Sequence, residues 1–338
     1  MGIKIITNNK IWMEQDAIHQ LKKISEYEGV TDIAGLPDLH SGKMPIGATF
    51  KTIDIIYPLI IGNDVGCGIS LFNTGVKLKK INIPSVIKRL EGTSIYGKYT
   101  IGGGNHFIEM QTIEKIYNKD YAKQLDLDRN KVYLMIHSGS RAFGEKIYKQ
   151  YGSPKGYKTN TKEFREYLKA HEEGVEIAKE NRIQLADIFM DMLNYKYDNK
   201  MIVDCFHNYL EINDDGFYHH KGSVSTLENE FALIAGSRGS YSYIVRCIPK
   251  EETLFSISHG AGRKWARGMC KGKLERKYKR DELKQSKLGS VVITNDKALL
   301  YEEATEAYKN IEEVISILED YGVIEVIARM KPEVTYKC

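Results

Sequence analysis

The feature of this sequence that most constrains its fold is a junction that recurs along the chain. At each junction an apolar, strand-like segment runs into a loop rich in glycine, asparagine or serine, and the loop carries a histidine, an aspartate or a cysteine. Two such strands are predicted at 131–136 and 203–206, and His137 and His207 follow them directly. Because several strand ends carry side chains of this kind, the pattern favours one shared site over a set of independent turns.

The polar side chains at these junctions have the chemistry of metal ligands. The candidate set is Asp64, Cys67, His106, His137 and His207. Asp64 and Cys67 lie among three glycines after the stretch 53–61, for which we predict a buried strand. A carboxylate together with a thiolate suits a divalent transition metal better than magnesium or calcium. Taken singly, the cysteine could equally be a buried apolar residue, and each histidine a satisfied core or turn residue.

A second glycine-rich junction lies at 255–267. A predicted strand there runs into His259, Gly260, Ala261 and Gly262, and a helix is predicted to start directly after them. Glycines let backbone amides approach a bound group, and a helix N-terminus favours an anion. A neutral imidazole is a nucleophile near pH 7, so attack by His259 on phosphorus is chemically available. The alternative is a turn histidine without a chemical role.

Other polar stretches allow two interpretations each. Asp38 and His40 are two residues apart in a loop rich in proline and glycine, where they could simply satisfy a turn. The loop 235–240 offers backbone amides and hydroxyls that suit a phosphate. Between residues 263 and 280, nine of eighteen residues are Lys or Arg, so this run could contact a phosphate backbone or be a solvated face.

Helices are predicted at 162–195, capped by Thr161, and at 296–318, with a strand at 323–327. His171 falls on a helix face and is expected to be solvated. His219 and His220 precede a Lys-Gly pair, where they could reach a phosphate or water.

Composition excludes several classes of protein. The five cysteines are scattered without a CxxC pair, which favours neither a disulfide framework nor a zinc ribbon. No signal-peptide or membrane-spanning pattern is present, so we expect a cytoplasmic protein that does not contact membranes. The net charge of +4 permits nucleic-acid binding. No linker or repeat divides the chain, and we expect a single domain over residues 1–338.

Several motifs together resemble the RtcB family of GTP-dependent RNA ligases. They occur in the family order between residues 37 and 337 and include PDLHSGKMPIG, GNDVGCGI, GGGNHFIE, MIHSGSRAFG, FHNYLE, SISHGAGR and EEATEAYKNI. The resemblance implies an α+β fold in which mixed sheets pack centrally with helices around them, and an active site at strand-to-loop junctions.

The resemblance also implies a reaction. The family joins RNA ends bearing a 2',3'-cyclic phosphate or 3'-phosphate to 5'-hydroxyl ends, in tRNA splicing or RNA repair, and a helper protein can promote turnover. The residue that becomes guanylylated by GTP matches His259. Two Mn²⁺ ions per chain are implied, with ligands that match the five candidates above. The implied guanylate contacts match Asn105, Glu109, Asn208, Ser237, Ala261, Tyr308 and Lys337, and Arg141 matches an arginine near the site that could contact a phosphate.

The chain departs from the usual family pattern at a few positions. It is shorter, Arg238 replaces a methionine, His220 replaces an arginine, and Cys338 replaces a terminal glycine. We expect Arg238 to add a phosphate contact or to alter the nucleotide pocket. Two alternatives to a ligase stay open: a guanylyltransferase that caps 3'-phosphate ends without efficient sealing, and a non-catalytic protein that binds RNA or stores metal.

Overall fold

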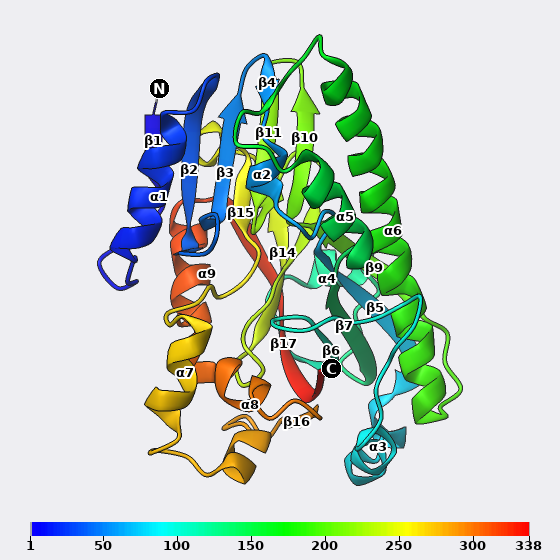
Figure 1. The fold of residues 1–338 in the computed structure, drawn as a ribbon. Helices are drawn as coiled ribbons and strands as arrows, with labels where there is room; N and C mark the ends of the chain where they lie inside the picture. The colour runs from blue at the N-terminus through cyan, green and yellow to red at the C-terminus, as the bar shows by residue number, and fades with distance from the viewer. Residues whose placement is uncertain (1, 338) are drawn as a thin grey trace.

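A computed structural model describes residues 2–337, and Figure 1 shows how its elements are arranged. Cys338, one of the departures noted above, lies outside the described residues. At the centre lies a mixed sheet of eight strands in the order β13-β14-β17-β6-β7-β5-β9, with β16 paired to β17. The bounds of these strands are β5 Gly68–Lys77, β6 Phe107–Ile116, β7 Lys131–Ser138, β9 Lys200–Phe206, β13 Phe231–Ile234, β14 Ser242–Cys247, β16 Val291–Thr294 and β17 Ile324–Lys337.

A second sheet of five strands lies beside the first, in the order β1-β2-β3-β11-β10, and two short strand pairs complete the described sheets. The bounds of the five are β1 Gly2–Ile5, β2 Val30–His40, β3 Ile46–Thr52, β10 Asn208–Asn213 and β11 Gly216–Lys221. The short pairs are β12 Ser223–Ser225 with β15 Ser256–Ser258, and β4 Ile55–Ile56 with β8 Tyr157–Lys158.

Helices surround the sheets, and the longest, α6, runs along one side of the molecule (Figure 1). Their bounds are α1 Gln15–Ser25, α2 Pro58–Ile61, α3 Ile83–Leu90, α4 Lys119–Gln124, α5 Ala142–Tyr151, α6 Lys162–Leu193, α7 Arg267–Leu274, α8 Leu299–Glu302 and α9 Ile311–Asp320. The prediction of an α+β fold with central mixed sheets and surrounding helices is confirmed. The single domain over 1–338 stays a prediction.

Both faces of the eight-stranded sheet are buried, and β7 shows how this positions the site. Val132 and Leu134 face a core shared with α3 and α6. Tyr133 and Met135 face the opposite core, which is shared with α9. Because successive side chains of a strand alternate between faces, His137 continues the row of Tyr133 and Met135. Its imidazole therefore lies on the α9 side of the sheet.

The predicted helix at 162–195 is confirmed as α6, and the Oγ1 atom of Thr161 accepts a hydrogen bond from the backbone N–H of Phe164. The predicted strand at 323–327 is the start of the longer β17. Among residues 2–337 no helix combines the length and the apolar character that a bilayer crossing requires.

Two sequence predictions of secondary structure are wrong. The strand at 53–61 is interrupted, because Asp54 has a φ of 62° and Pro58 starts the short helix α2. The helix at 296–318 is divided into α8, a 3₁₀ turn at Thr305–Ala307 and α9. The backbone between α8 and α9 instead binds the loop after β15, where Lys264 N–H donates to Ala307 and Lys309 N–H donates to Gly262.

Candidate active site

The five predicted metal ligands meet at neighbouring strand ends of the eight-stranded sheet. β5 pairs with both β7 and β9, so that Gly68 lies opposite Ser138 on one side and Phe206 on the other. In the adjacent pair, Phe107 lies opposite His137. This register gathers the residues that precede β5, precede β6, end β7 and follow β9. They are Asp64, Cys67, His106, His137 and His207.

The side chains of this cluster are in direct contact. Cys67 Sγ lies 3.3 Å from Nε2 of His106 and 3.3 Å from Nε2 of His137. His137 Nε2 lies 3.2 Å from His207 Nε2, and His106 Nε2 lies 3.1 Å from Asp64 Oδ2. The atoms form two groups that could each hold one metal ion, Asp64–Cys67–His106 and Cys67–His137–His207. Cys67 belongs to both groups.

The protonation preferences of the cluster suit metal binding. Burial lowers the pKa of His137 and of His207 well below the usual value, so both imidazoles are neutral and can offer lone pairs. Burial raises the pKa of the Cys67 thiol well above its usual value, so its thiolate form needs a cation beside it. Two histidine nitrogens that face each other next to a thiol fit a shared cation better than a closed set of hydrogen bonds.

Arg141 supports the Asp64 end of this cluster. Its Nη1 atom lies 3.0 Å from Asp64 Oδ2 and 2.9 Å from His106 Nδ1, and its backbone N–H donates to Asp64 Oδ1. Burial by itself would raise the pKa of Asp64, but the contacts with His106 and Arg141 lower it below the usual value. The carboxylate is therefore ionised at neutral pH.

His259 follows β15 and lies next to the cluster, with its ring centroid 4.7 Å from that of His207. Its Nδ1 atom donates to Oδ2 of the buried Asp38 over 2.8 Å. A carboxylate can only accept, so in the neutral imidazole the proton lies on Nδ1 and Nε2 carries the lone pair. Gly262 closes this arrangement with a φ of +70°, since a Cβ there would lie 2.2 Å from the Asp38 carbonyl oxygen.

Asp38 is a site residue that the sequence analysis left as one member of a turn. The only sequence feature that pointed to Asp38 was its position two residues before His40 in the PDLHSG motif. This spacing does not reveal that the carboxylate contacts His259. Lys309 holds the backbone around it, with Nζ donating to the carbonyls of Pro37 at 3.1 Å and Leu39 at 2.6 Å. Burial lowers the pKa of Lys309 to about 8.

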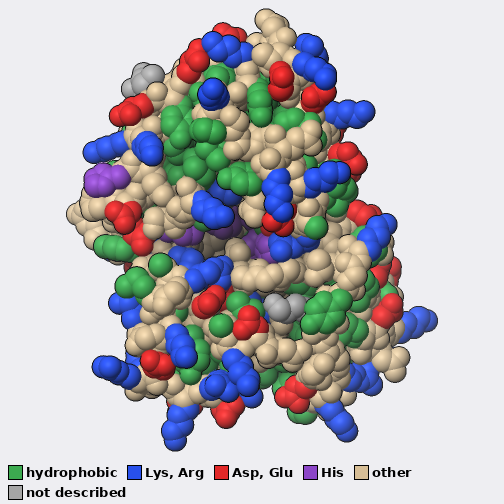
Figure 2. Space-filling model, viewed as in Figure 1, with side chains coloured by type: hydrophobic (Ala, Val, Ile, Leu, Met, Phe, Trp, Pro, Cys, Tyr) green, Lys and Arg blue, Asp and Glu red, His purple; other side chains and the backbone are tan. Residues whose placement is uncertain are grey.

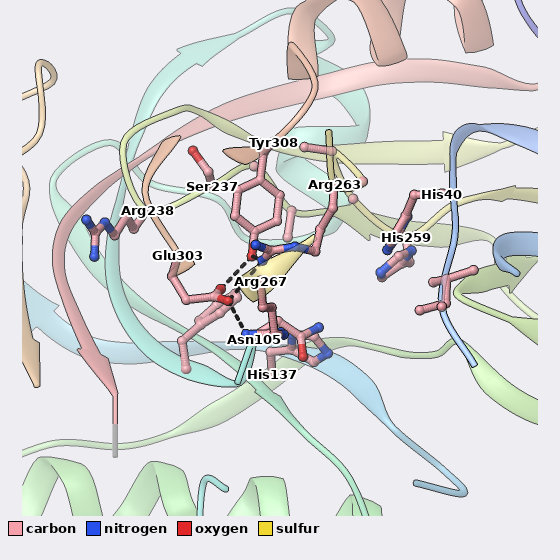
Figure 3. Close-up of a pocket in the computed structure, with 18 of the residues that line it drawn as sticks. His40, Asn105, His137, Ser237, Arg238, His259, Arg263, Arg267, Glu303 and Tyr308 are labelled. Carbon is pink, nitrogen blue, oxygen red and sulfur yellow. Dashed lines mark hydrogen bonds and ion pairs between the residues drawn. The ribbon is translucent and has the colours of Figure 1, made fainter. Parts of the chain in front are cut away.

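A cavity of about 540 Å³ extends from His137 and His259 between β6, β17 and the loops 235–240 and 259–267. Figure 3 shows residues that line it, with Tyr308, Arg263, Glu303 and Arg267 close together and His259 to one side of them. In the space-filling view, histidines lie at the bottom of a hollow whose rims carry Lys and Arg (Figure 2). Six of the predicted guanylate contacts line the cavity: Asn105, Glu109, Ser237, Ala261, Tyr308 and Lys337.

The seventh, Asn208, does not line this cavity. Its Oδ1 atom accepts from the Gly222 N–H at 3.2 Å, and its Nδ2 donates to the Asp64 carbonyl at 3.5 Å. It therefore lies behind the metal-ligand cluster and braces the loop that carries Asp64.

Glu303 organises the far end of the cavity, and the sequence analysis did not single it out. Its buried carboxylate contacts Arg263 at 3.1 Å, Arg267 at 2.5 Å and Lys337 at 3.6 Å, and accepts from the Tyr308 hydroxyl at 2.5 Å. Three of these four contacts are basic groups, and they hold the pKa of Glu303 below its usual value against the effect of burial. The only sequence signal was its place in the EEATEAYK motif.

Three predictions about individual polar residues need correction. The Arg238 guanidinium donates to the carbonyls of Leu299 and Leu300 and turns away from the cavity centre, so the phosphate contact is wrong (Figure 3). Arg238 does line the cavity, and an altered nucleotide pocket stays a prediction. His171 is buried and accepts from the Leu210 N–H. His219 and His220 are both fully buried and reach neither a phosphate nor water, and His220 contacts Glu211 at 3.0 Å.

The helix predicted directly after His259 begins only at Arg267. Its N-terminus therefore does not lie at the glycine turn. Anion contacts at that turn would come from backbone amides and from side chains.

A family model and three known proteins that resemble this chain all carry the same family name. A family model described as tRNA-splicing ligase RtcB matches residues 20–98 and 92–338. The chain is 35% identical to RNA-splicing ligase RtcB2 of Escherichia coli, over 98% of this chain and 94% of that protein. It is 29% identical to the tRNA-splicing ligase RtcB of Nanoarchaeum equitans, over 70% of this chain and 59% of that protein. For the tRNA-splicing ligase RtcB of Thermococcus kodakarensis the identity is 27%, over 69% of this chain and 58% of that protein. The chain thus spans less than two thirds of the length of these two archaeal relatives.

Proposed function

The chain belongs to the RtcB family, and from this premise we propose that it is a GTP-dependent RNA ligase. It joins an RNA end that carries a 3'-phosphate or a 2',3'-cyclic phosphate to an RNA end with a 5'-hydroxyl. The reaction serves tRNA splicing or RNA repair. The observation that carries this proposal is the Asp38–His259 pair, whose free imidazole nitrogen lies beside the two groups of metal-ligand atoms and at the edge of the cavity.

In the proposed reaction His259 is the nucleophile. Its Nε2 lone pair attacks the α-phosphorus of GTP, a P–N bond forms, and the bond to the bridging oxygen breaks to release pyrophosphate. The RNA 3'-phosphate then attacks the same phosphorus, so that GMP leaves the histidine and caps the RNA. Finally the 5'-hydroxyl attacks the 3'-phosphorus, the phosphodiester forms, and GMP is the leaving group. A 2',3'-cyclic phosphate must first be opened by water to give the 3'-phosphate.

Asp38 has a positioning role in this account. Its carboxylate fixes the proton on Nδ1 and stabilises the positive charge that builds on the ring as Nε2 forms a bond. Lys309 keeps Asp38 in place through the carbonyls on either side of it.

The metal-ligand cluster fits two Mn²⁺ ions. Asp64, Cys67 and His106 would hold one, and Cys67, His137 and His207 the other. Such ions supply positive charge that neutralises phosphoryl oxygens, and a thiolate ligand favours manganese over the harder magnesium.

The cavity fits the guanylate. Glu109 is buried there and accepts from Thr335 Oγ1 at 2.6 Å and from Gln111 Nε2 at 2.7 Å. Each carboxylate oxygen keeps a second lone pair that could accept from the N–H groups on the guanine edge. Adenine has no N–H at ring position 1, so this carboxylate is a reason to prefer GTP over ATP. The other proposed nucleotide contacts in the cavity are Asn105, Ser237, Ala261, Tyr308 and Lys337. Asn208 lies behind the metal-ligand cluster and supports the loop that carries Asp64.

The test is ligation of two synthetic RNAs, one with a 2',3'-cyclic phosphate and one with a 5'-hydroxyl, in the presence of GTP and Mn²⁺. We expect a joined product that fails to form with ATP or with magnesium alone. RNA that is capped with GMP but never joined would show a capping guanylyltransferase instead. RNA that is bound but neither capped nor joined would show a non-catalytic protein.

A further inference from the structure

The basic segment 263–280 has no role in the reaction described so far. It leaves the cavity directly, because Arg263, Trp265, Ala266 and Arg267 line the cavity wall and α7 continues from Arg267. The segment then crosses the surface at the lower left of Figure 1 and reaches the 3₁₀ turn Arg280–Lys284. Any strand that leaves the cavity on this side must pass over it.

The charges of this segment are unbalanced. Arg263 and Arg267 are paired with Glu303. The other seven basic residues form no ion pair within 4 Å among the described residues, and Glu275 is the one acidic residue in the segment. These seven are Lys264, Lys271, Lys273, Arg276, Lys277, Lys279 and Arg280. A merely solvated surface usually mixes both signs, whereas repelling cations of one sign fit an anionic partner.

Aromatic rings lie among these cations. The Nζ atoms of Lys264 and Lys273 lie 5.4 and 5.1 Å from the ring centroid of Trp265. The Nζ atom of Lys277 lies 5.2 Å from the ring centroid of Tyr278. Trp265 is only partly buried against the cluster around Leu274. Rings that alternate with a line of cations are what single-stranded nucleic acid uses for base stacking and phosphate contacts.

The surface of α7 also lets a partner come close. Gly268 and Gly272 are one helical turn apart, and a Cβ at either would meet no atom within 4 Å. Packing within the described chain therefore gives no reason for glycine at these two positions, although each glycine weakens the helix. Their open backbone leaves room for a sugar–phosphate strand.

We propose that Trp265 and the basic residues 264–280 form the entry surface for single-stranded RNA, along which the strand leading to the reacting end reaches the cavity. This inference rests on the proposed ligase function for the identity of the polymer. Trp265 stacks a base at the cavity mouth, and the lysines and arginines of α7 and its following loop contact the phosphates behind it.

The test measures binding of a fluorescent single-stranded RNA with unreactive ends, without GTP, over a range of salt concentrations. The variant carries Lys273→Gln, Arg276→Gln and Lys277→Gln. The control carries Lys77→Gln, Lys79→Gln and Lys80→Gln, which remove three exposed, unpaired lysines just before α3, across the view from α7 in Figure 1.

We expect the slope of log K against log salt to fall by about 2 in the α7 variant, and the affinity at 0.1 M salt to fall about 100-fold. The control should bind RNA as the unchanged protein does. Equal slopes and affinities for the α7 variant and the control would overturn the proposal.

A second variant tests the stacking. Trp265→Leu keeps an apolar side chain against Leu274 but removes the ring, so RNA affinity should fall about tenfold while the salt slope stays the same. If the RNA affinity and the thermal unfolding of this variant were both unchanged, Trp265 would not be part of the RNA-binding surface.

Labelling of the protein by GTP is measured in parallel, which separates the two proposals. An unlabelled protein whose RNA binding still depends on the α7 residues would contradict the ligase reaction and support the RNA surface. A labelled protein whose RNA binding ignores those residues would contradict the surface alone. Vesicles of anionic phospholipid give a further control. If the α7 variant lost binding to these vesicles but still bound RNA as the unchanged protein does, the basic residues 264–280 would serve a membrane and the proposal would be overturned.

Discussion

His259 and Asp38 come from segments more than two hundred residues apart, and their contact determines which nitrogen of the imidazole can react. The Nδ1–H is committed to Oδ2 of Asp38, so only Nε2 remains for chemistry. The glycine turn places the ring, Gly262 allows the close approach to Asp38, and Lys309 holds the Asp38 backbone. A single proton position thus depends on three local structures.

Replacement of Asp38 by Asn should slow labelling of the protein by GTP by about 10²- to 10⁴-fold, because the amide no longer fixes the imidazole tautomer or stabilises its charge. The measurement is the rate of covalent GMP incorporation at saturating GTP and Mn²⁺. Asp32→Asn, on the same strand β2, is the control and should label at the normal rate. A normal rate for Asp38→Asn would contradict the positioning role.

Cys67 belongs to both groups of metal-ligand atoms, so its loss should affect both ions. We expect Cys67→Ala to weaken binding of both Mn²⁺ ions by at least about 100-fold and to lower GMP labelling with them. The number of Mn²⁺ ions that remain bound per chain after dialysis measures this loss. Cys205→Ala, which removes another buried thiol from the neighbouring strand, should keep two ions. Retention of both ions by Cys67→Ala would remove this residue from the ligand set.

At the scale of elements, α6 supports the site through one buried cation. Arg182 is fully buried, and its guanidinium donates to Asp204 as well as to the carbonyls of Gly66 and Ser138 at 3.0 Å. Gly66 precedes Cys67 and Ser138 follows His137. The helix therefore fixes two of the loops that carry metal-ligand residues.

Arg182→Met should lower the free energy of unfolding by about 3–5 kcal/mol, because Asp204, whose side chain is only 10% exposed, is left as a charge without its basic partner. Urea denaturation followed by circular dichroism measures this loss. Arg165→Met, at an exposed position of the same helix, should change the free energy of unfolding by less than about 0.5 kcal/mol. Similar losses in the two variants would show that Arg182 does not brace the loops.

Local sequence signals predicted those elements that depend on local interactions. Thr161 identified the start of α6, and the apolar run before His137 identified β7. Local sequence signals failed where contacts between distant segments determine the secondary structure. The stretch 303–310 has helix-forming residues, yet Glu303 and the backbone of Ala307 and Lys309 bind partners near residue 263, and these contacts outweigh helix propensity.

At the scale of the whole molecule, the sequence located the cluster but not its surroundings. His106, His137 and His207 could be predicted because each follows or precedes a strand with a clear pattern. Asp38 and Glu303 could not, because their partners His259, Arg263 and Lys337 come close only through the tertiary fold. A contact between distant segments leaves no spacing in the sequence that could reveal it.

Buried histidines should make the folded protein sensitive to acid. Burial lowers the pKa of His40 and of His171 to about 4 and that of His219 to about 3, and all three lie outside the metal-ligand cluster. The unfolded chain takes up these protons below about pH 6.5, whereas the folded chain does not. Stability is therefore present above pH 6.5 and falls as the pH drops toward 4, by up to about 4 kcal/mol per pH unit for three groups.

The measurement is the urea midpoint of unfolding at pH 7 and at pH 5, with metal removed by a chelator at both values. The midpoint should be clearly lower at pH 5. Equal midpoints would mean that these histidines are already protonated or exposed in the folded protein.

The central claim is that His259 becomes covalently guanylylated, and one experiment addresses it directly. The protein is incubated with radiolabelled GTP and Mn²⁺, separated on a denaturing gel, and digested for mass mapping of the adduct. We predict a single GMP on His259, labile to acid as a phosphoramidate is, and absent from His259→Ala protein that still binds two metal ions. An adduct on another residue, or a folded and metal-loaded protein that takes up no GMP, would contradict the account.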